Sequence, residues 1–359
     1  MTLSNSELSD NQAFEYEGGA IESFNSALRI SNATMNNNTA SESGGAIYSN
    51  EGTVLIISNS RFRNNMSGYS GGAISTNLES ASLINNVFSG NESTSVGGAI
   101  GMLASDVTID TNTFLNNSSQ TGGAIATSLE SIIRLIDSTL SGNDAVSNGG
   151  AIRASDSSLT IQGSTIDNNT ALGGAAMRVI DGSTARLLNS TVSGNTASFA
   201  TGGIDVNNSS LTLTSSTVVN NTAASFAGGL YRGGASASIV TLNSIVANNE
   251  GGDCNTIIDS FLASDWFGDS TCDGIADGNP GLAPLADNGG ETRTHALLAS
   301  SGAIDSAAQL TCTQTTQSRD QRGFERIGQC DVGAFEFGAS DTTFYVIPLP
   351  DGGTVVVPL

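Results

Sequence analysis

The stretch that decides the fold is SLTIQGSTIDNN, residues Ser158–Asn169. Leu159 and Ile161 alternate with polar residues, and after a short bend Ile166 stands three positions before Asn169. An apolar residue at every second position is typical of a short β-strand with one buried face. Fifty-two residues further on, the chain writes the same pattern again as SLTLTSSTVVNN. Short strands of one kind therefore recur along this sequence at a fixed spacing.

Two markers give the length of the repeat. The first is Gly-Gly-Ala-Ile, which begins at Gly18, Gly44, Gly71, Gly97, Gly122 and Gly149, with weaker copies at Gly173, Gly202 and Gly228. The second is an Asn that follows an apolar residue by three positions, at Asn11, Asn38, Asn65, Asn91, Asn117, Asn143, Asn169, Asn195, Asn221 and Asn249. Six of the nine steps between these Asn residues are 26 residues long. A fixed period in this range indicates a repeat architecture.

We therefore predict an all-β protein, a parallel β-helix of about ten coils with roughly 26 residues, three strands and three turns in each. The two glycines should allow a bend with positive φ and leave no side chain to clash with the next coil. The Asn should adopt the left-handed conformation and stack as an amide ladder. The apolar column before it should fill the interior: Leu8, Met35, Phe62, Phe88, Phe114, Leu140, Ile166, Val192, Val218 and Val246.

The charge balance and the positions of the cysteines limit which partners the protein can have and in which compartment it works. The chain of 359 residues has 12 cationic residues, all of them Arg, against 34 acidic ones, and its net charge is −22. Such a charge repels phosphates, which excludes nucleic acids and anionic membrane surfaces as partners. No apolar run is long enough to span a membrane. All four Cys follow residue 250, which indicates disulfides and an oxidising, extracellular compartment. The first residues enter the repeat directly and are not a signal peptide, so we expect an exported protein whose leader is not in this sequence.

The repeats resemble a known family. Gly-Gly-Ala-Ile combined with Phe-x-x-Asn, as at Phe62 to Asn65, resembles the passenger repeats of chlamydial polymorphic membrane proteins. These belong to the wider right-handed parallel β-helix, pectate-lyase-like superfamily. The resemblance covers residues 1–250 and implies a right-handed parallel β-helix.

The C-terminal part resembles a second family. NPGLAPLADNGGETRTHALLASSGAIDSA, followed by DQRGFERIGQCDVGAFEF, is similar to the choice-of-anchor Q domain of bacterial surface β-helix proteins. The resemblance implies a closing domain over residues 251–337, a bacterial cell-surface location, and a packing or hydrogen-bonding role for His295. Sequential pairing of Cys254 with Cys272 and of Cys312 with Cys330 fits this segment, although four Cys allow three connectivities. Residues 338–359 should form a β-hairpin tail.

Catalysis is not expected, and no catalytic residue is assigned. A lyase needs a base facing an acidic sugar, yet the chain has no Lys, and a hydrolase needs paired carboxylates that no neighbouring repeats supply. Gly-Gly begins only 4 to 7 positions after each Asn, which leaves little room for the walls of a cleft. The alternative remains a polysaccharide lyase or glycoside hydrolase of the pectate-lyase-like superfamily.

Three groups of residues are candidate binding sites. Arg153, Arg178 and Arg232 fall near the same place in their repeats with Asp205 between them, which suits either an anionic glycan or a solvated Arg–Asp ladder. Phe199 and Phe226 lie in the turns after the Asn and either stack on sugar rings or are buried. Asp269, Asp273 and Asp277 resemble part of a Ca²⁺ loop, against the simpler interpretation of an acidic turn.

A column of Thr raises one further possibility. Thr113, Thr139, Thr165, Thr191 and Thr217 form a single ladder, but no second rank of Thr stands beside it, as an ice-binding face would require. We expect a secreted or cell-surface structural and adhesive module that binds a polysaccharide or another surface. No cofactor is required, and Ca²⁺ is a weak candidate.

Overall fold

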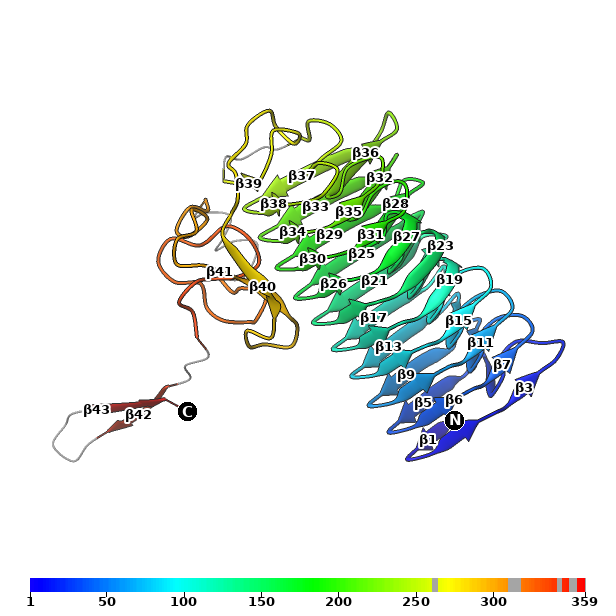
Figure 1. Ribbon diagram of the computed structural model, residues 1–359. Coiled ribbons are helices and arrows are strands. Elements are labelled where there is room, and N and C mark those ends of the chain that lie inside the picture. Colours follow the sequence, from blue (N-terminus) through cyan, green and yellow to red (C-terminus); the bar gives the residue numbers. More distant parts are fainter. Residues whose placement is uncertain (260–263, 309–317, 341–343, 349–353, 359) are drawn as a thin grey trace.

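The computed structural model describes residues 1–259, 264–308 and 318–340, and the backbone of 344–348 and 354–358. The chain winds into a parallel β-solenoid in which each coil adds one strand to each of four sheets, A to D (Figure 1). The predicted all-β parallel β-helix is confirmed, but the expected three strands per coil are wrong by one. The missed sheet is made largely of two-residue strands, which are too short to show an alternating pattern.

The strands follow one another in every coil in the order D, A, B, C. Sheet A contains β1 (Thr2–Ser4), β5 (Ala27–Ser31), β9 (Val54–Ser58), β13 (Ser80–Ile84), β17 (Asp106–Asp110), β21 (Ser131–Ile136), β25 (Ser157–Gln162), β29 (Thr184–Leu188), β33 (Ser210–Thr214) and β37 (Ser238–Leu242). Sheet B contains β2 (Glu7–Ser9), β6 (Thr34–Asn36), β10 (Arg61–Arg63), β14 (Val87–Ser89), β18 (Thr113–Leu115), β22 (Thr139–Ser141), β26 (Thr165–Asp167), β30 (Thr191–Ser193), β34 (Thr217–Val219), β38 (Ile245–Ala247) and β39 (Trp266–Phe267). Sheet C contains β3 (Gln12–Ala13), β7 (Thr39–Ala40), β11 (Met66–Ser67), β15 (Glu92–Ser93), β19 (Ser118–Thr121), β23 (Asp144–Asn148), β27 (Thr170–Gly173), β31 (Thr196–Ala197) and β35 (Thr222–Ala223). Sheet D contains β4 (Ile21–Phe24), β8 (Ile47–Asn50), β12 (Ile74–Asn77), β16 (Ile100–Leu103), β20 (Ile125–Ser128), β24 (Ile152–Ser155), β28 (Met177–Ile180), β32 (Ile204–Asn207) and β36 (Leu230–Gly233).

The predicted interior column is in register and buried. Phe62, Phe88 and Phe114 pair directly across sheet B, and their rings stack with centroids 4.9 Å apart. All three side chains are 0% exposed. Leu8, in the first coil, is only partly buried because no coil covers it on that side. Aromatic stacking at the coil spacing thus adds to the burial of apolar surface.

The paired glycines have the two roles predicted from the sequence, a bend with positive φ and close stacking of the coils. Gly44 adopts φ +70°, a conformation that side chains with a Cβ rarely adopt. A Cβ on the second glycine, Gly45, would lie 2.0 Å from the carbonyl oxygen of Gly72 in the next coil. The first glycine therefore permits the bend, and the second permits the coils to stack.

The Asn markers form a continuous ladder between sheets B and C. In Asn117, for example, the backbone N–H and the side-chain Nδ2 both donate to Oδ1 of Asn143, at 3.0 and 2.9 Å. The same side chain also donates to the carbonyl of Phe88 in the preceding coil, at 3.1 Å. We expected the ladder Asn itself to adopt the left-handed conformation, and this is wrong. The left-handed residue is the one before it, such as Asn116 at φ 52°. The ladder satisfies buried backbone groups at a corner where no sheet pairs them.

Residues 251–259 and 264–279 close the C-terminal end of the solenoid. β39 adds to sheet B beyond β38, and Asp265 accepts a hydrogen bond from the backbone N–H of Ser244 at 2.8 Å. The N–H of Trp266 donates to the carbonyl of Ser244, at 2.9 Å. The last coil therefore has its strand edge and one of its corners paired by this segment.

The segment that follows lies along the flank of the solenoid rather than over its end. β40 (Leu282–Ala286) and β41 (Thr294–Leu297) pair antiparallel and lie beside sheet B (Figure 1). Thr165 donates to the carbonyl of Arg293 at 2.6 Å, and Thr217 accepts from the N–H of Ala334 at 3.0 Å. Three members of the Thr column, Thr165, Thr191 and Thr217, are thereby almost fully buried. In these coils the column is part of an internal interface and not an exposed face.

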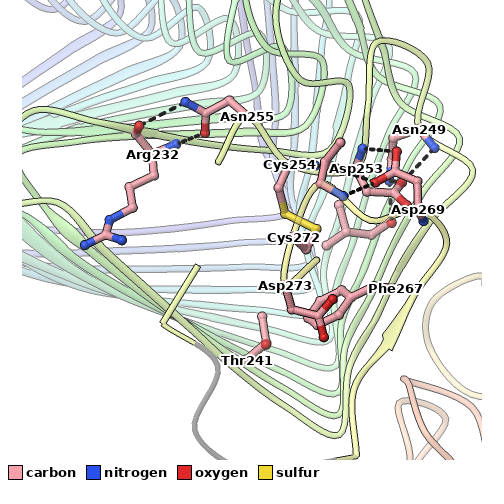
Figure 2. Close-up of a disulfide and its surroundings, with 12 residues drawn as sticks. Arg232, Thr241, Asn249, Asp253, Cys254, Asn255, Phe267, Asp269, Cys272 and Asp273 are labelled. Atoms are coloured by element: carbon pink, nitrogen blue, oxygen red, sulfur yellow. Dashed lines mark hydrogen bonds between the residues drawn. A yellow bond between two sulfur atoms is a disulfide. The ribbon is translucent and has the colours of Figure 1, made fainter. Parts of the chain in front are cut away.

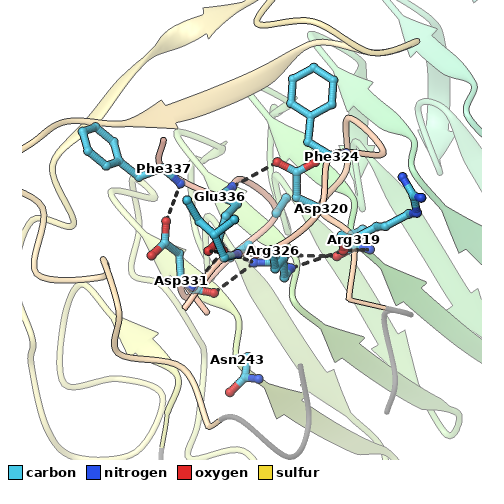
Figure 3. A network of polar contacts seen from close by, with 12 residues as sticks. Asn243, Arg319, Asp320, Phe324, Arg326, Asp331, Glu336 and Phe337 are labelled. Atoms are coloured by element: carbon cyan, nitrogen blue, oxygen red, sulfur yellow. Dashed lines mark hydrogen bonds and ion pairs between the residues drawn. The ribbon is translucent and has the colours of Figure 1, made fainter. Parts of the chain in front are cut away.

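An ion-pair network holds this segment together (Figure 3). Arg326 lies 3.1 Å from Glu336, and both side chains are buried. Arg326 also donates to Oδ1 of Asn189 in the solenoid, at 3.1 Å. Burial lowers the pKa of Arg326, while Glu336 and Asp320 oppose that shift.

The tail forms the predicted hairpin, with β42 (Phe344–Pro348) antiparallel to β43 (Thr354–Pro358).

Candidate functional site

The outer face of sheet D carries one column of side chains that varies in size from coil to coil. Register places in this column Glu22, Tyr48, Ser75, Gly101, Ala126, Arg153, Arg178, Asp205 and Tyr231. Between Tyr48 and Arg153 the three residues are small. The face is therefore hollow over these coils and raised at either end.

The hollow is a groove of about 410 Å³. The turns between sheets C and D line one side of it with Glu42, Tyr69, Ser70 and Val96, and the ends of the sheet D strands line the other with Asn77, Leu103 and Ser128. Gly101 lies in register between Ser75 and Ala126, and a Cβ there would lie 2.0 Å from the hydroxyl of Ser70, which would have to turn away. Tyr48 and Arg153 are four coils apart, which corresponds to about 19 Å at ~4.8 Å per coil.

Two tyrosines define one end of the groove. Tyr69 stands on the turn and is 58% exposed, while Tyr48 is half-buried in the sheet. Burial raises the pKa of Tyr48, a hydrogen bond with Asn77 opposes the rise, and nearby carboxylates including Glu17 add to it. Tyr48 therefore stays a neutral phenol, and both rings offer amphipathic faces of the kind that contact sugar rings.

Arginines define the other end. Arg178 is engaged, because its Nη1 donates to Oδ1 of Asn148 at 2.6 Å and lies 3.2 Å from Asp205. Arg153, one coil earlier, lines the groove, and across the described residues nothing forms a hydrogen bond or an ion pair with its guanidinium. Burial lowers the pKa of Arg153, Asp181 opposes this, and Arg178 adds to the fall. Arg153 is thus a half-buried cation without a counter-ion in contact.

Arg232 does not belong to this column. Register pairs it with the inward-facing Val206, one position away from Asp205. Its guanidinium donates to the carbonyl of Ala237 at 2.7 Å and pairs with Asp259 at 3.3 Å. The expected set of three arginines is therefore two, with Arg232 instead bound within the closing end of the solenoid.

Phe199 and Phe226 lie on neighbouring turns, outside the groove. Both side chains are exposed, at 51% and 42%, so the expected alternative of burial is not what the structure has. Their rings meet edge to face at 5.7 Å, and Phe226 meets Tyr231 in the same way at 5.5 Å. They form a second, smaller aromatic surface near the C-terminal end of sheet D.

The acidic turn uses its carboxylates locally. Asp269 accepts from the N–H of Thr271 at 2.9 Å, Asp273 from the N–H of Ile275 at 2.8 Å, and Asp277 from the N–H of Phe267 at 2.9 Å. Within the ranges that the structure describes, no three His, Cys, Asp or Glu side chains gather as metal ligands. The Ca²⁺ site stays a prediction.

One predicted disulfide, Cys254–Cys272, is confirmed (Figure 2). The disulfide is buried at the C-terminal end of the core. There the backbone of Cys254 forms an isolated parallel β-bridge with Leu230 of the last coil. The predicted partner of Cys330, Cys312, lies outside the described residues, so the second pairing stays a prediction. A disulfide is consistent with an extracellular protein.

His295 has the hydrogen-bonding role expected of it. Its Nδ1 lies 2.7 Å from the carbonyl oxygen of Ala283, and its Nε2 lies 2.8 Å from the hydroxyl of Ser193. The ring is buried, and burial lowers its pKa. It joins the flanking segment to sheet B.

The groove itself was not predicted. Its residues are visible in the sequence, since the position after each Gly-Gly-Ala-Ile reads Glu22, Tyr48, Ser75, Gly101, Ala126 and Arg153. Ser75, Gly101 and Ala126 are small and give no apolar or charged pattern, so the sequence does not indicate a groove at these coils. The large residues at the two ends of the groove, Tyr48 and Arg153, are the signal at this position of the repeat.

Two known family models match this chain. The model of the right-handed β-helix region matches residues 47–249, more than half of the chain. The model of the Chlamydia polymorphic membrane protein repeat matches residues 32–50. The chain belongs to the right-handed β-helix family and is a repeat protein similar to chlamydial polymorphic membrane protein passengers. No curated protein and no solved structure matches it.

Neither match extends over the C-terminal segment. The likeness to choice-of-anchor Q domains therefore stays a prediction. Among the residues described, no helix has the length and apolar character to cross a bilayer.

Proposed function

We propose that this protein is a surface-exposed structural and adhesive module of an exported protein, and that the groove on sheet D binds a glycan. The observation that carries the proposal is the groove between Tyr48 and Arg153. Its length suits several sugar units lying across consecutive coils, and its lining combines aromatic rings, hydroxyls, an amide and an unpaired cation. Sugars are bound by this mixture of apolar faces and hydrogen-bonding groups.

The similarity to polymorphic membrane protein repeats and the disulfide support a location outside the cell. The stacked coils support a rigid projecting module, because every coil between the first and the last is paired on both sides through four sheets and the Asn ladder. No particular arrangement of groups in the groove favours the enzyme alternative over binding.

The test is a panel of acidic and neutral oligosaccharides, titrated against the protein and assayed in parallel for new reducing or unsaturated ends. Tyr69→Ala should weaken binding roughly tenfold, because stacking on an aromatic face contributes on the order of 1 kcal/mol. Tyr16→Ala is the matched control, since Tyr16 is 66% exposed on the corresponding turn of the first coil and does not line the groove.

Binding without cleavage, weakened by Tyr69→Ala and not by Tyr16→Ala, supports the proposal. Cleavage would instead establish the lyase or hydrolase alternative. Absence of binding across the panel would overturn the assignment of the groove to glycans.

A further inference from the structure

We infer that the groove selects a glycan carrying a single acidic sugar, with the acid group bound by Arg153 and uncharged sugars lying toward Tyr48. This inference rests on the proposed function and names the chemical class of its ligand. It depends on how charge is distributed along the groove.

The cation at one end is available for a ligand. Arg178 is already bonded to Asn148 and Asp205, at 2.6 and 3.2 Å, so it cannot turn toward the groove without losing both contacts. Arg153 has no such contact within the described chain, and it lines the groove. A guanidinium in this state binds a carboxylate or sulfate through two parallel hydrogen bonds. Asp181 and Arg178 act on Arg153 with opposite signs, and neither forms a hydrogen bond or an ion pair with its guanidinium.

The opposite end is acidic. Glu17 and Glu42 line the groove, and Glu22 stands in the same column as Tyr48, one coil away. A second acidic sugar placed there would meet carboxylates of the same sign at short range, where salt screens the repulsion only in part. The net charge of −22 adds to this penalty for any polyanion. The tyrosine end therefore favours uncharged sugars.

Small residues separate the two ends. Ser75, Gly101 and Ala126 form the floor over the coils between Tyr48 and Arg153. They bring no charge, so an uncharged stretch of glycan can lie against them. The acid group must then stand at or near one end of the bound segment.

The experiment compares three tetrasaccharides by titration at two salt concentrations. These are a neutral tetrasaccharide, a tetrasaccharide of the same length with one terminal sialic acid, and tetragalacturonic acid. We expect the mono-acidic ligand to bind at least tenfold more tightly than either of the others, and its advantage to shrink at high salt. Arg153→Gln should lower the affinity for the mono-acidic ligand roughly tenfold and leave that for the neutral one unchanged.

Arg186→Gln is the matched control, because Arg186 is an exposed arginine on sheet A and its loss changes the net charge equally. Glu42→Gln should raise the affinity for tetragalacturonic acid. If the neutral ligand binds as tightly as the mono-acidic one, or tetragalacturonic acid binds more tightly than both, the inference is overturned while glycan binding stands. If none of the three binds and the wider panel also fails, the proposed function itself falls.

Discussion

Asn249 donates both its backbone N–H and its side-chain Nδ2 to a single oxygen, Oδ1 of Asp253, at 3.1 and 2.8 Å (Figure 2). The Asn ladder that begins at Asn11 therefore ends on a carboxylate. The other oxygen of Asp253 accepts from the N–H of Asp269 at 2.9 Å. An acid is suited to this position, because every group that reaches it is a donor and a further Asn would bring an unwanted donor of its own.

Removing the acceptor at the end of the ladder should lower the free energy of unfolding more than removing most single contacts would. Asp253→Ala leaves the two donors of Asn249 unpaired in a buried corner, and we expect it to lower the free energy of unfolding by about 2–4 kcal/mol. Asp253→Asn keeps one acceptor oxygen and should cost less. Denaturant unfolding of the three proteins checks this order; equal stability of Asp253→Ala and the native protein would show that the ladder needs no terminal acceptor.

The middle of the ladder gives a second prediction. Asn143 accepts from the backbone and side chain of Asn117 and donates to the carbonyl of Phe114 at 3.2 Å. Asn143→Ala should therefore destabilise the protein by about 2–4 kcal/mol, measured by the denaturation midpoint. The control is Asn116→Gly, in the exposed left-handed position that Gly142 fills one coil later, and it should change stability by less than about 0.5 kcal/mol. Similar costs for the two variants would contradict a structural role specific to the ladder.

Structural features that recur in every coil could be predicted from the sequence, whereas features that occur once could not. The interior column around Phe88, the paired glycines and the ladder could be read from it, because each physical requirement recurs in every coil. Sheet C escaped prediction because two residues cannot show a period. The groove was not predicted because it lies over small residues such as Gly101, and small side chains leave no apolar or charged pattern in the sequence. The flanking position of residues 280–308 and 318–337 depends on contacts made once, such as that of Gln321 with Thr191.

Gln321 is the basis of a third prediction. Its Nε2 donates to Thr165 Oγ1 and Thr292 Oγ1, both at 2.9 Å, and its Oε1 accepts from Thr191 at 2.6 Å. Gln321→Ala should loosen the flanking segment by about 2–3 kcal/mol and leave the coils folded. Hydrogen exchange followed by mass spectrometry should show faster exchange over residues 280–308 and 318–337, with no change before residue 150.

The control for that experiment is Gln120→Ala, an exposed glutamine on β19. It should not alter exchange in the flanking segment. Uniformly faster exchange through all coils in Gln321→Ala would mean that the segment and the solenoid unfold as one unit.

Glu79 introduces a pH dependence into the solenoid. It occupies the corner position that Ser105 holds in the next coil, its side chain is buried, and its Oε2 accepts from the hydroxyl of Ser49 at 2.5 Å. Burial raises the pKa of Glu79 to about 8, and the hydrogen bond from Ser49 opposes the rise. The folded protein thus binds this proton more tightly than the unfolded chain, whose glutamate titrates near 4.5. The stability contributed by the protonated form is fully present below pH 4.5 and is lost as the pH rises through 8.

Glu79→Gln removes the titrating group and keeps its shape. We expect the variant to match the native protein near pH 4 and to be more stable by a few kcal/mol at pH 9, because about 1.4 kcal/mol corresponds to each unit of pKa shift. Unfolding curves recorded across this range check the prediction, and Glu92→Gln, on the exposed side of sheet C, should leave the pH profile unchanged. A parallel pH profile for Glu79→Gln and the native protein would mean that Glu79 titrates normally and is open to water.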